Sequence, residues 1–240
     1  MAETESAHHA MDRLLADLRR IFGARLRSIG TYGGRDPAAP SFVGDEGVHT
    51  VAFVDAVTMA DLSACAQASA GWTRSGLAIP LVLPHDELSR SLDAFPLEYE
   101  EIRATYTEVF GGNPFLAVHI TVEDRRRACE AQAKSHLLHL REGYIESGGR
   151  GAAVARLMTD SGAAFRALLA NVTRLHGAPA ESVDAVIAHA DTLGLSRSLI
   201  SEILAIRAGR GLAAADAARL FPPYLDAVER LARLVDRWHA

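Results

Sequence analysis

The residues with the clearest chemical potential lie in a glycine turn near the N-terminus. The turn, Gly33-Gly34, follows the short apolar segment 29–32, and a run rich in β-branched residues follows at 48–54. Glycines after a strand let the backbone pass close to a phosphate, because no Cβ stands in the way. An ordinary tight turn is the alternative, since a glycine pair alone is a weak signal.

Three carboxylates flank the same apolar run. Asp45 and Glu46 precede it, and Asp55 follows it. Carboxylate oxygens are the ligands that magnesium prefers in proteins. Asp55 stands at the end of the predicted strand that is farther from the glycine turn. We therefore expect its side chain to lie away from that turn.

The elements around the turn can be read from hydrophobic periodicity. Apolar residues at three- and four-residue steps predict a helix over 10–22, ahead of the glycine segment. The run 48–54 predicts a strand. Thr58 and Asp61 have the spacing of a capping box, which predicts a short helix over 61–66.

A third strand is predicted over 77–83. Its residues are apolar on both faces, which favours a central position in the sheet. Pro80 favours an edge position or a bulge instead, because proline cannot donate a hydrogen bond to a neighbouring strand. Both positions remain open at this point.

The order of helix, strand, Gly-Gly, loop, strand and helix resembles the nucleotidyltransferase (polymerase β-like) fold. The resemblance covers roughly the first hundred residues. The segment 95–102 has the pattern F-P-x-E-x-x-x-I, and 110–114 has the pattern hydrophobic-G-x-x-P. In this combination the chain resembles a subgroup of bacterial nucleotidyltransferase-like proteins.

The resemblance implies a nucleotide triphosphate at the glycine turn and magnesium on an Asp-x-Asp pair plus a third carboxylate. Here the pair falls at Gly47 and His49, and 77–83 contains no acid. The resemblance therefore implies a metal site that has been lost, with no catalytic residue, no metal and no other cofactor. The nucleotide-binding candidates that it implies are Thr31, Gly33, Gly34, His49 and Glu98.

Three functions follow for this chain. The favoured one is a catalytically degenerate nucleotidyltransferase-like protein that acts as a binding or regulatory module, with a nucleotide or a partner protein as its ligand. The second is an active, magnesium-dependent enzyme that transfers NMP to a small molecule or a protein, using Asp45, Glu46 and Asp55 as displaced metal ligands. The third is a helical scaffold that forms a homodimer through the apolar stripe of 224–238.

The breaker-rich segment 111–114 predicts a domain boundary. The fold class is then α+β, with a nucleotidyltransferase-like mixed sheet and flanking helices over 1–112 and an antiparallel helical bundle over 113–240. Five helices are predicted in the bundle, over 124–146, 151–176, 182–193, 196–208 and from Pro222 or Pro223 to 238. His136, His139 and Glu142 recur at three-residue steps, which favours a partly exposed polar stripe over a zinc site.

Composition and charge limit which ligands and which cellular location we expect for this chain. The formal net charge of -5 argues against a general nucleic-acid binder or a binder of anionic membranes. Cys65 and Cys129 lie far apart in helix-period sequence and predict two free thiols. The acidic start and the lack of a long uncharged apolar stretch predict a soluble, cytoplasmic protein.

Overall fold

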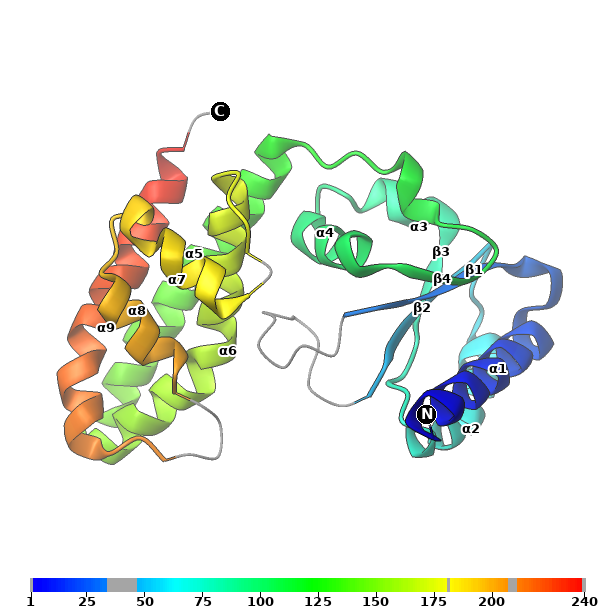
Figure 1. The fold of residues 1–240 in the computed structure, drawn as a ribbon, viewed down its shortest axis with the longest axis horizontal. Coiled ribbons are helices and arrows are strands. Elements are labelled where there is room, and N and C mark those ends of the chain that lie inside the picture. The colour runs from blue at the N-terminus through cyan, green and yellow to red at the C-terminus, as the bar shows by residue number, and fades with distance from the viewer. Residues whose placement is uncertain (1, 34–46, 181, 207–210, 239–240) are drawn as a thin grey trace. The chain divides into compact units, whose positions relative to one another are not determined.

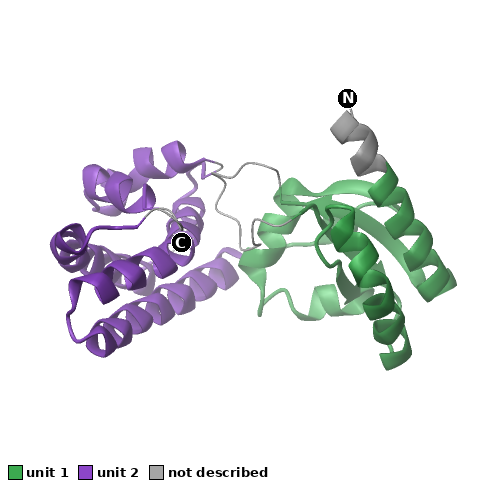
Figure 2. Cartoon of the chain, turned by 90° about the horizontal axis from the view of Figure 1, so that it is seen from below, with its two compact units in different colours: residues 1–37, 43–120 green, residues 38–42, 121–240 purple. Residues whose placement is uncertain are grey.

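The structure is a computed structural model that describes residues 2–33, 47–180, 182–206 and 211–238 (Figure 1). The chain forms two compact units, which we treat separately (Figure 2). Unit 1 comprises 1–37 and 43–120, and unit 2 comprises 38–42 and 121–240. The predicted boundary after Gly112 lies within unit 1 by this division.

Unit 1 contains a four-stranded mixed sheet with the order β3-β2-β1-β4. Its strands are β1 (Leu26–Tyr32), β2 (His49–Val54), β3 (Leu81–Pro84) and β4 (Thr107–Phe110). β1 is antiparallel to both β2 and β4, whereas β2 is parallel to β3. The mixed sheet and its flanking helices confirm the predicted α+β fold class.

The outer strands differ from the sequence prediction. β3 begins at Leu81, directly after Pro80, and lies at an edge of the sheet. The central position that its apolar residues favoured is therefore wrong, and the edge position that Pro80 favoured is confirmed. β4 was not predicted at all. It ends at Phe110. At the next residue, Gly111, a Cβ would lie 1.9 Å from the Arg27 carbonyl oxygen, so only glycine lets this turn approach β1 so closely.

Helices cover both faces of the sheet (Figure 1). α1 (Ala2–Phe22) and α2 (Met59–Arg74) pack on one face, where their apolar side chains meet Ile29, Ala52 and Val54. The opposite face, with Val51 and Phe53, is covered by α3, α4 and the 3-10 helix η2. These elements span His85–Arg90, Pro96–Thr105 and Pro114–Ala117. Alternate residues of β2 therefore face two separate cores.

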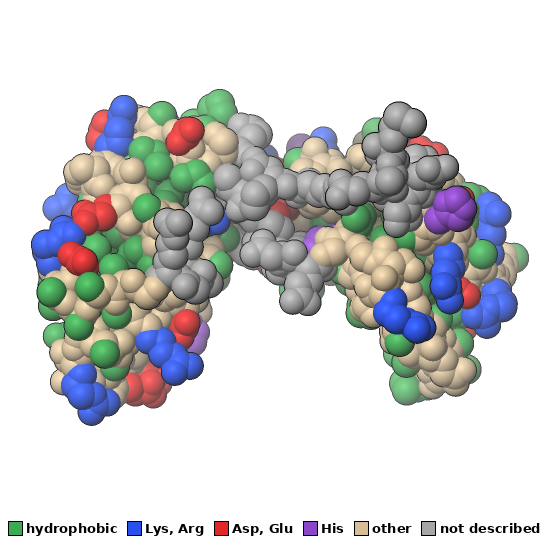
Figure 3. Space-filling model, turned by 60° about the horizontal axis from the view of Figure 1, so that its bottom comes forward, with side chains coloured by type: hydrophobic (Ala, Val, Ile, Leu, Met, Phe, Trp, Pro, Cys, Tyr) green, Lys and Arg blue, Asp and Glu red, His purple; other side chains and the backbone are tan. Residues whose placement is uncertain are grey.

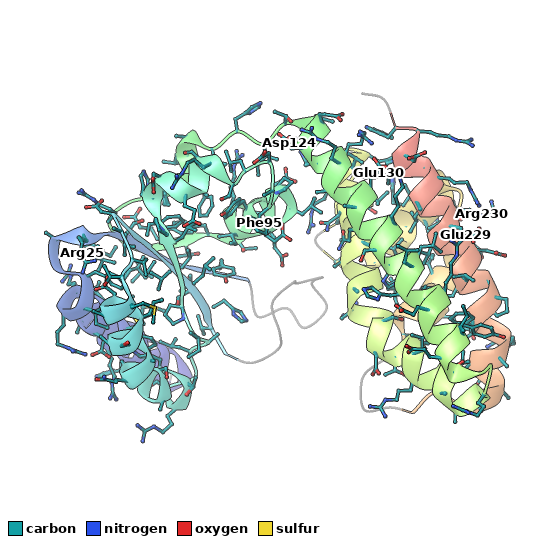
Figure 4. All side chains as sticks on the ribbon, turned by 180° about the vertical axis from the view of Figure 1, so that it is seen from behind. Arg25, Phe95, Asp124, Glu130, Glu229 and Arg230 are labelled. Carbon is teal, nitrogen blue, oxygen red and sulfur yellow. The ribbon has the colours of Figure 1, made fainter. Side chains whose placement is uncertain are left out.

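The start of α2 confirms the predicted capping box. The backbone N–H of Asp61 donates to the Thr58 hydroxyl, and the backbone N–H of Thr58 donates to the Asp61 carboxylate. Asp61 also accepts two hydrogen bonds from Arg25, at 2.7 and 2.8 Å (Arg25 is labelled in Figure 4). The Arg25 guanidinium holds the pKa of Asp61 well below its usual value. These contacts tie the start of α2 to the segment that leads into β1.

Unit 2 is helical. Its helices are α5 (Val122–Ser147), α6 (Gly151–Leu175), α7 (Val183–His189), α8 (Arg197–Leu204) and α9 (Ala214–Asp236). The long helices α5, α6 and α9 pack against one another, and α5 runs antiparallel to the other two (Figure 1). No helix in the described part of the chain is both long and apolar enough to cross a membrane.

The last helix begins earlier than predicted. α9 starts at Ala214, and Pro222 and Pro223 lie inside it. Two prolines remove two backbone donors, but the burial of Phe221 and Tyr224 on either side favours a continued helix. Tyr224, Val228, Leu231 and Val235 of the apolar stripe are fully buried within unit 2. This part of the stripe is therefore core and not a surface on which a second copy could dock.

The predicted polar stripe on α5 is wrong at His136. This side chain is buried, its Nε2 lies 2.8 Å from the Tyr224 hydroxyl, and its ring stacks on Phe165. Burial lowers the pKa of His136 to about 4. His139 and Glu142 are exposed. Partnership with a buried tyrosine explains why a histidine occupies the core face of this helix.

Candidate functional site

The candidate site lies where β1 ends and β2 begins. Tyr32 and His49 are paired directly across the two strands, and their ring centroids are 5.8 Å apart. Gly33 follows with a φ of +68°, and a Cβ built on it would lie 3.7 Å from the His49 ring. The structure therefore brings Gly33 and His49 together.

Helix α4 contacts this turn. The backbone N–H of Gly33 donates to the Thr105 hydroxyl at 2.9 Å, and that hydroxyl donates to the Glu101 carbonyl oxygen at 3.0 Å. Burial, together with the negative charge of Glu101, raises the pKa of Tyr32. The Gly33 N–H therefore already has an acceptor within the protein.

Sequence reasoning missed Tyr32, Glu101 and Thr105. The available signal was helical spacing, because Glu98, Glu101 and Thr105 stand at i, i+3 and i+7 and share one face of α4. Glu98 itself is half-buried in the first turn of that helix. It is separated from Thr105 by about 10 Å along the helix axis, so it does not reach the Gly33 turn through the same contact.

Thr31 does not face the same side as His49. It is paired with Thr50 of β2 and Thr107 of β4, and it shares the sheet face of Ile29 that α1 and α2 cover. The Thr50 hydroxyl is buried and has no hydrogen-bond partner within the described residues. The row of threonines is therefore separated from the Tyr32–His49 pair by the sheet itself.

Gly47 occupies the place of the first expected metal-binding Asp, and its surroundings are closed. Its φ is +90°, a conformation that strongly favours glycine. A Cβ at this position would lie 2.9 Å from the Ala78 amide nitrogen and 2.9 Å from the Gly76 carbonyl oxygen. Backbone atoms thus fill the space that a side chain would need.

Of the three acids that could be displaced metal ligands, the structure describes Asp55, and Asp55 lies away from the turn. Asp55 accepts two hydrogen bonds from Arg27, at 2.5 and 2.8 Å, which lower its pKa. It follows Val54, about 20 Å along the strand from the His49 end. Gly34, Asp45 and Glu46 lie outside the described residues. Among those that are described, no group of three His, Cys, Asp or Glu side chains could hold a metal ion.

Comparison with known proteins supports the fold. No protein-family model matches the sequence, and no curated protein matches it. The structure is similar to the crystal structure of the spectinomycin adenyltransferase AAD(9) from Enterococcus faecialis with ATP and spectinomycin. The TM-score is 0.53 at 11% identity, over 93% of this chain and 98% of that one. The chain therefore has a nucleotidyltransferase-like fold with a helical C-terminal region.

Proposed function

We propose that this chain is a catalytically degenerate nucleotidyltransferase-like protein that acts as a binding or regulatory module. The observation that carries the proposal is the closed environment of Gly47, at the place where the fold's metal site requires a carboxylate. His49 stands two residues later, and imidazole is a poor ligand for magnesium. Without an anchored cation, little would neutralise the charge that develops on a transferring phosphoryl group.

The ligand is a nucleotide or a partner protein. Tyr32 and His49 offer ring surface for a base, but the Gly33 N–H is already engaged by Thr105. We therefore expect nucleotide binding to be weak and to be independent of magnesium.

Calorimetric titration of the purified chain with ATP, with and without magnesium, tests the proposal. A weak heat signal that magnesium does not strengthen, together with no transfer of a labelled adenylyl group to the protein or to added acceptors, is the expected result. Tight binding that requires magnesium, accompanied by turnover, would overturn it.

An active nucleotidyltransferase is the second candidate, since the similar solved structure holds ATP and spectinomycin. Its metal ligands would be Asp45 and Glu46, because Asp55 is engaged by Arg27 at the other end of β2. The double variant D45N/E46Q would then abolish transfer, whereas D55N, which removes one charge far from the turn, would leave it measurable. Equal activity in the parent protein, D45N/E46Q and D55N would exclude these acids as metal ligands.

A further inference from the structure

A cavity of about 550 Å³ lies in unit 2, at the C-terminal end of α9. Its wall is formed by α9, by His176 at the end of α6, and by Leu193 and Gly194. The volume falls within the range of about 300–1,000 Å³ that is typical of small-molecule sites. The residues that line the cavity belong to unit 2, whereas the Gly33 turn belongs to unit 1.

Three arginines line this cavity: Arg230 and Arg233 of α9, and Arg237 directly after the helix. Arg230 and Arg233 stand at i and i+3 and therefore share one face of the helix. Arg233 pairs with Glu229 at 3.2 Å, and Glu229 also accepts a hydrogen bond from Arg141 (Arg230 and Glu229 are labelled in Figure 4). Within the described residues, Arg230 and Arg237 form no ion pair.

The charge balance at this cavity is unusual for the unit. On the face shown in Figure 3, Lys and Arg side chains of unit 2 (left) lie beside Asp and Glu side chains. The described lining of the cavity contains three guanidinium groups and no carboxylate. Arg233 is already paired with Glu229, whereas Arg230 and Arg237 offer planar guanidinium forks that match the oxygens of a phosphate.

Two residues of the lining, His176 and Trp238, also carry buried ring nitrogens that lack a partner within the described residues. The Nε1 of Trp238 and the Nε2 of His176 are buried and have no hydrogen-bond partner within the described residues. The two rings lie 4.1 Å apart by their centroids, and His189 lies 5.8 Å from His176 with its own Nε2 unpartnered. Buried ring nitrogens are usually satisfied in native proteins, and water or a ligand group that reached this cluster would satisfy them. Trp238 can only donate, which again suits an acceptor-rich molecule.

We propose that this cavity binds a small phosphate ester that carries a ring. The phosphate oxygens accept hydrogen bonds from Arg230 and Arg237, and the ring packs against Trp238 and Leu234. Neither the fold nor the glycine turn of unit 1 requires this site. The proposal therefore stands independently of whether unit 1 binds a nucleotide.

The test uses the full chain labelled with ¹⁵N, titrated with phenyl phosphate and, separately, with inorganic phosphate. The chain has two tryptophans, so its spectrum has two indole N–H signals, from Trp72 of unit 1 and Trp238 of the cavity. Phenyl phosphate is expected to shift the Trp238 signal in a saturable manner and to leave the Trp72 signal in place. Inorganic phosphate is expected to bind about tenfold more weakly, because it lacks the ring.

Arginine variants test whether phenyl phosphate binds specifically in the cavity or is attracted to any exposed arginine. R230A/R237A is expected to weaken binding of phenyl phosphate by at least about tenfold, since each charge-assisted hydrogen bond contributes substantially. R230K/R237K, which keeps both charges, is expected to retain part of the affinity. R156A is the control, because Arg156 is an exposed arginine of α6 outside the cavity.

Three outcomes would overturn the proposal. They are the absence of saturable binding, an affinity that R230A/R237A leaves unchanged while the protein stays folded, and an equal loss in R156A. Equal affinity for phenyl phosphate and inorganic phosphate would overturn the proposal that the ligand carries a ring that packs in the cavity.

Discussion

Replacement of Gly47 by alanine tests whether the expected metal-binding position has room for a side chain. Holding a non-glycine residue at a φ near +90° costs about 1–2 kcal/mol. Forcing a Cβ to within 2.9 Å of backbone atoms of Gly76 and Ala78 costs a further ~1–3 kcal/mol, because backbone cannot rotate away as a side chain can. We expect G47A to destabilise unit 1 by about 2–5 kcal/mol.

Gly76 provides a matched control. Its φ is +80°, but nothing lies within 4 Å of a Cβ built on it. G76A should therefore carry the backbone strain alone, about 1–2 kcal/mol. The difference between G47A and G76A then isolates the steric contact at Gly47.

The assay follows each unit by its own tryptophan. Trp72 is buried in unit 1, so its fluorescence in a W238F background reports the unfolding of that unit. At about 4 °C per kcal/mol, the midpoint of G47A should lie about 4–12 °C below that of G76A. Equal midpoints for the two variants, or a G47D protein as stable as the parent, would show that a carboxylate fits at position 47. The argument for a closed metal site would then fail.

Three further predictions concern single interactions. T105V removes the acceptor of the Gly33 N–H and should accelerate hydrogen exchange at that amide, with a loss of stability of about 0.5–1.5 kcal/mol. His136 binds a proton less readily in the folded state, with a pKa of about 4 against 6.5, so the unfolded state carries more protons between these values. The stability of unit 2 should consequently fall by up to about 3 kcal/mol as pH drops through that window, as measured by urea unfolding, and H136F should flatten this dependence. T58A should cost unit 1 about 1 kcal/mol through loss of the helix cap, which thermal unfolding followed at Trp72 would detect.

Local signals in the sequence predicted a large part of the fold. The β-branched run that became β2, the capping box at Thr58 and the long helices α5 and α6 each depend on residues close together in the chain. The order of these elements was enough to predict a mixed sheet followed by helices. Even the edge position of β3 was signalled by Pro80, although apolar content argued the other way.

What could not be predicted depends on contacts between distant residues. β4 is too short to show a period. It follows Tyr106, whose ring packs against Gly30 of β1, where a Cβ would lie 2.2 Å from the ring. The helix α9 continues through two prolines because its buried face outweighs the missing donors. His136 is a core residue because Tyr224, 88 positions later, supplies its partner.

The candidate site, like the fold, could be predicted from the sequence only in part. Spacing alone indicated that no carboxylate stands at 47 or 49, but only the structure reveals that backbone atoms fill the space beside Gly47. A simple loss of an acid could be reversed by one substitution, whereas a closed backbone environment cannot. For this reason the double variant G47D/H49D is not expected to gain magnesium-dependent nucleotide transfer, and transfer activity in that protein would refute the steric argument directly.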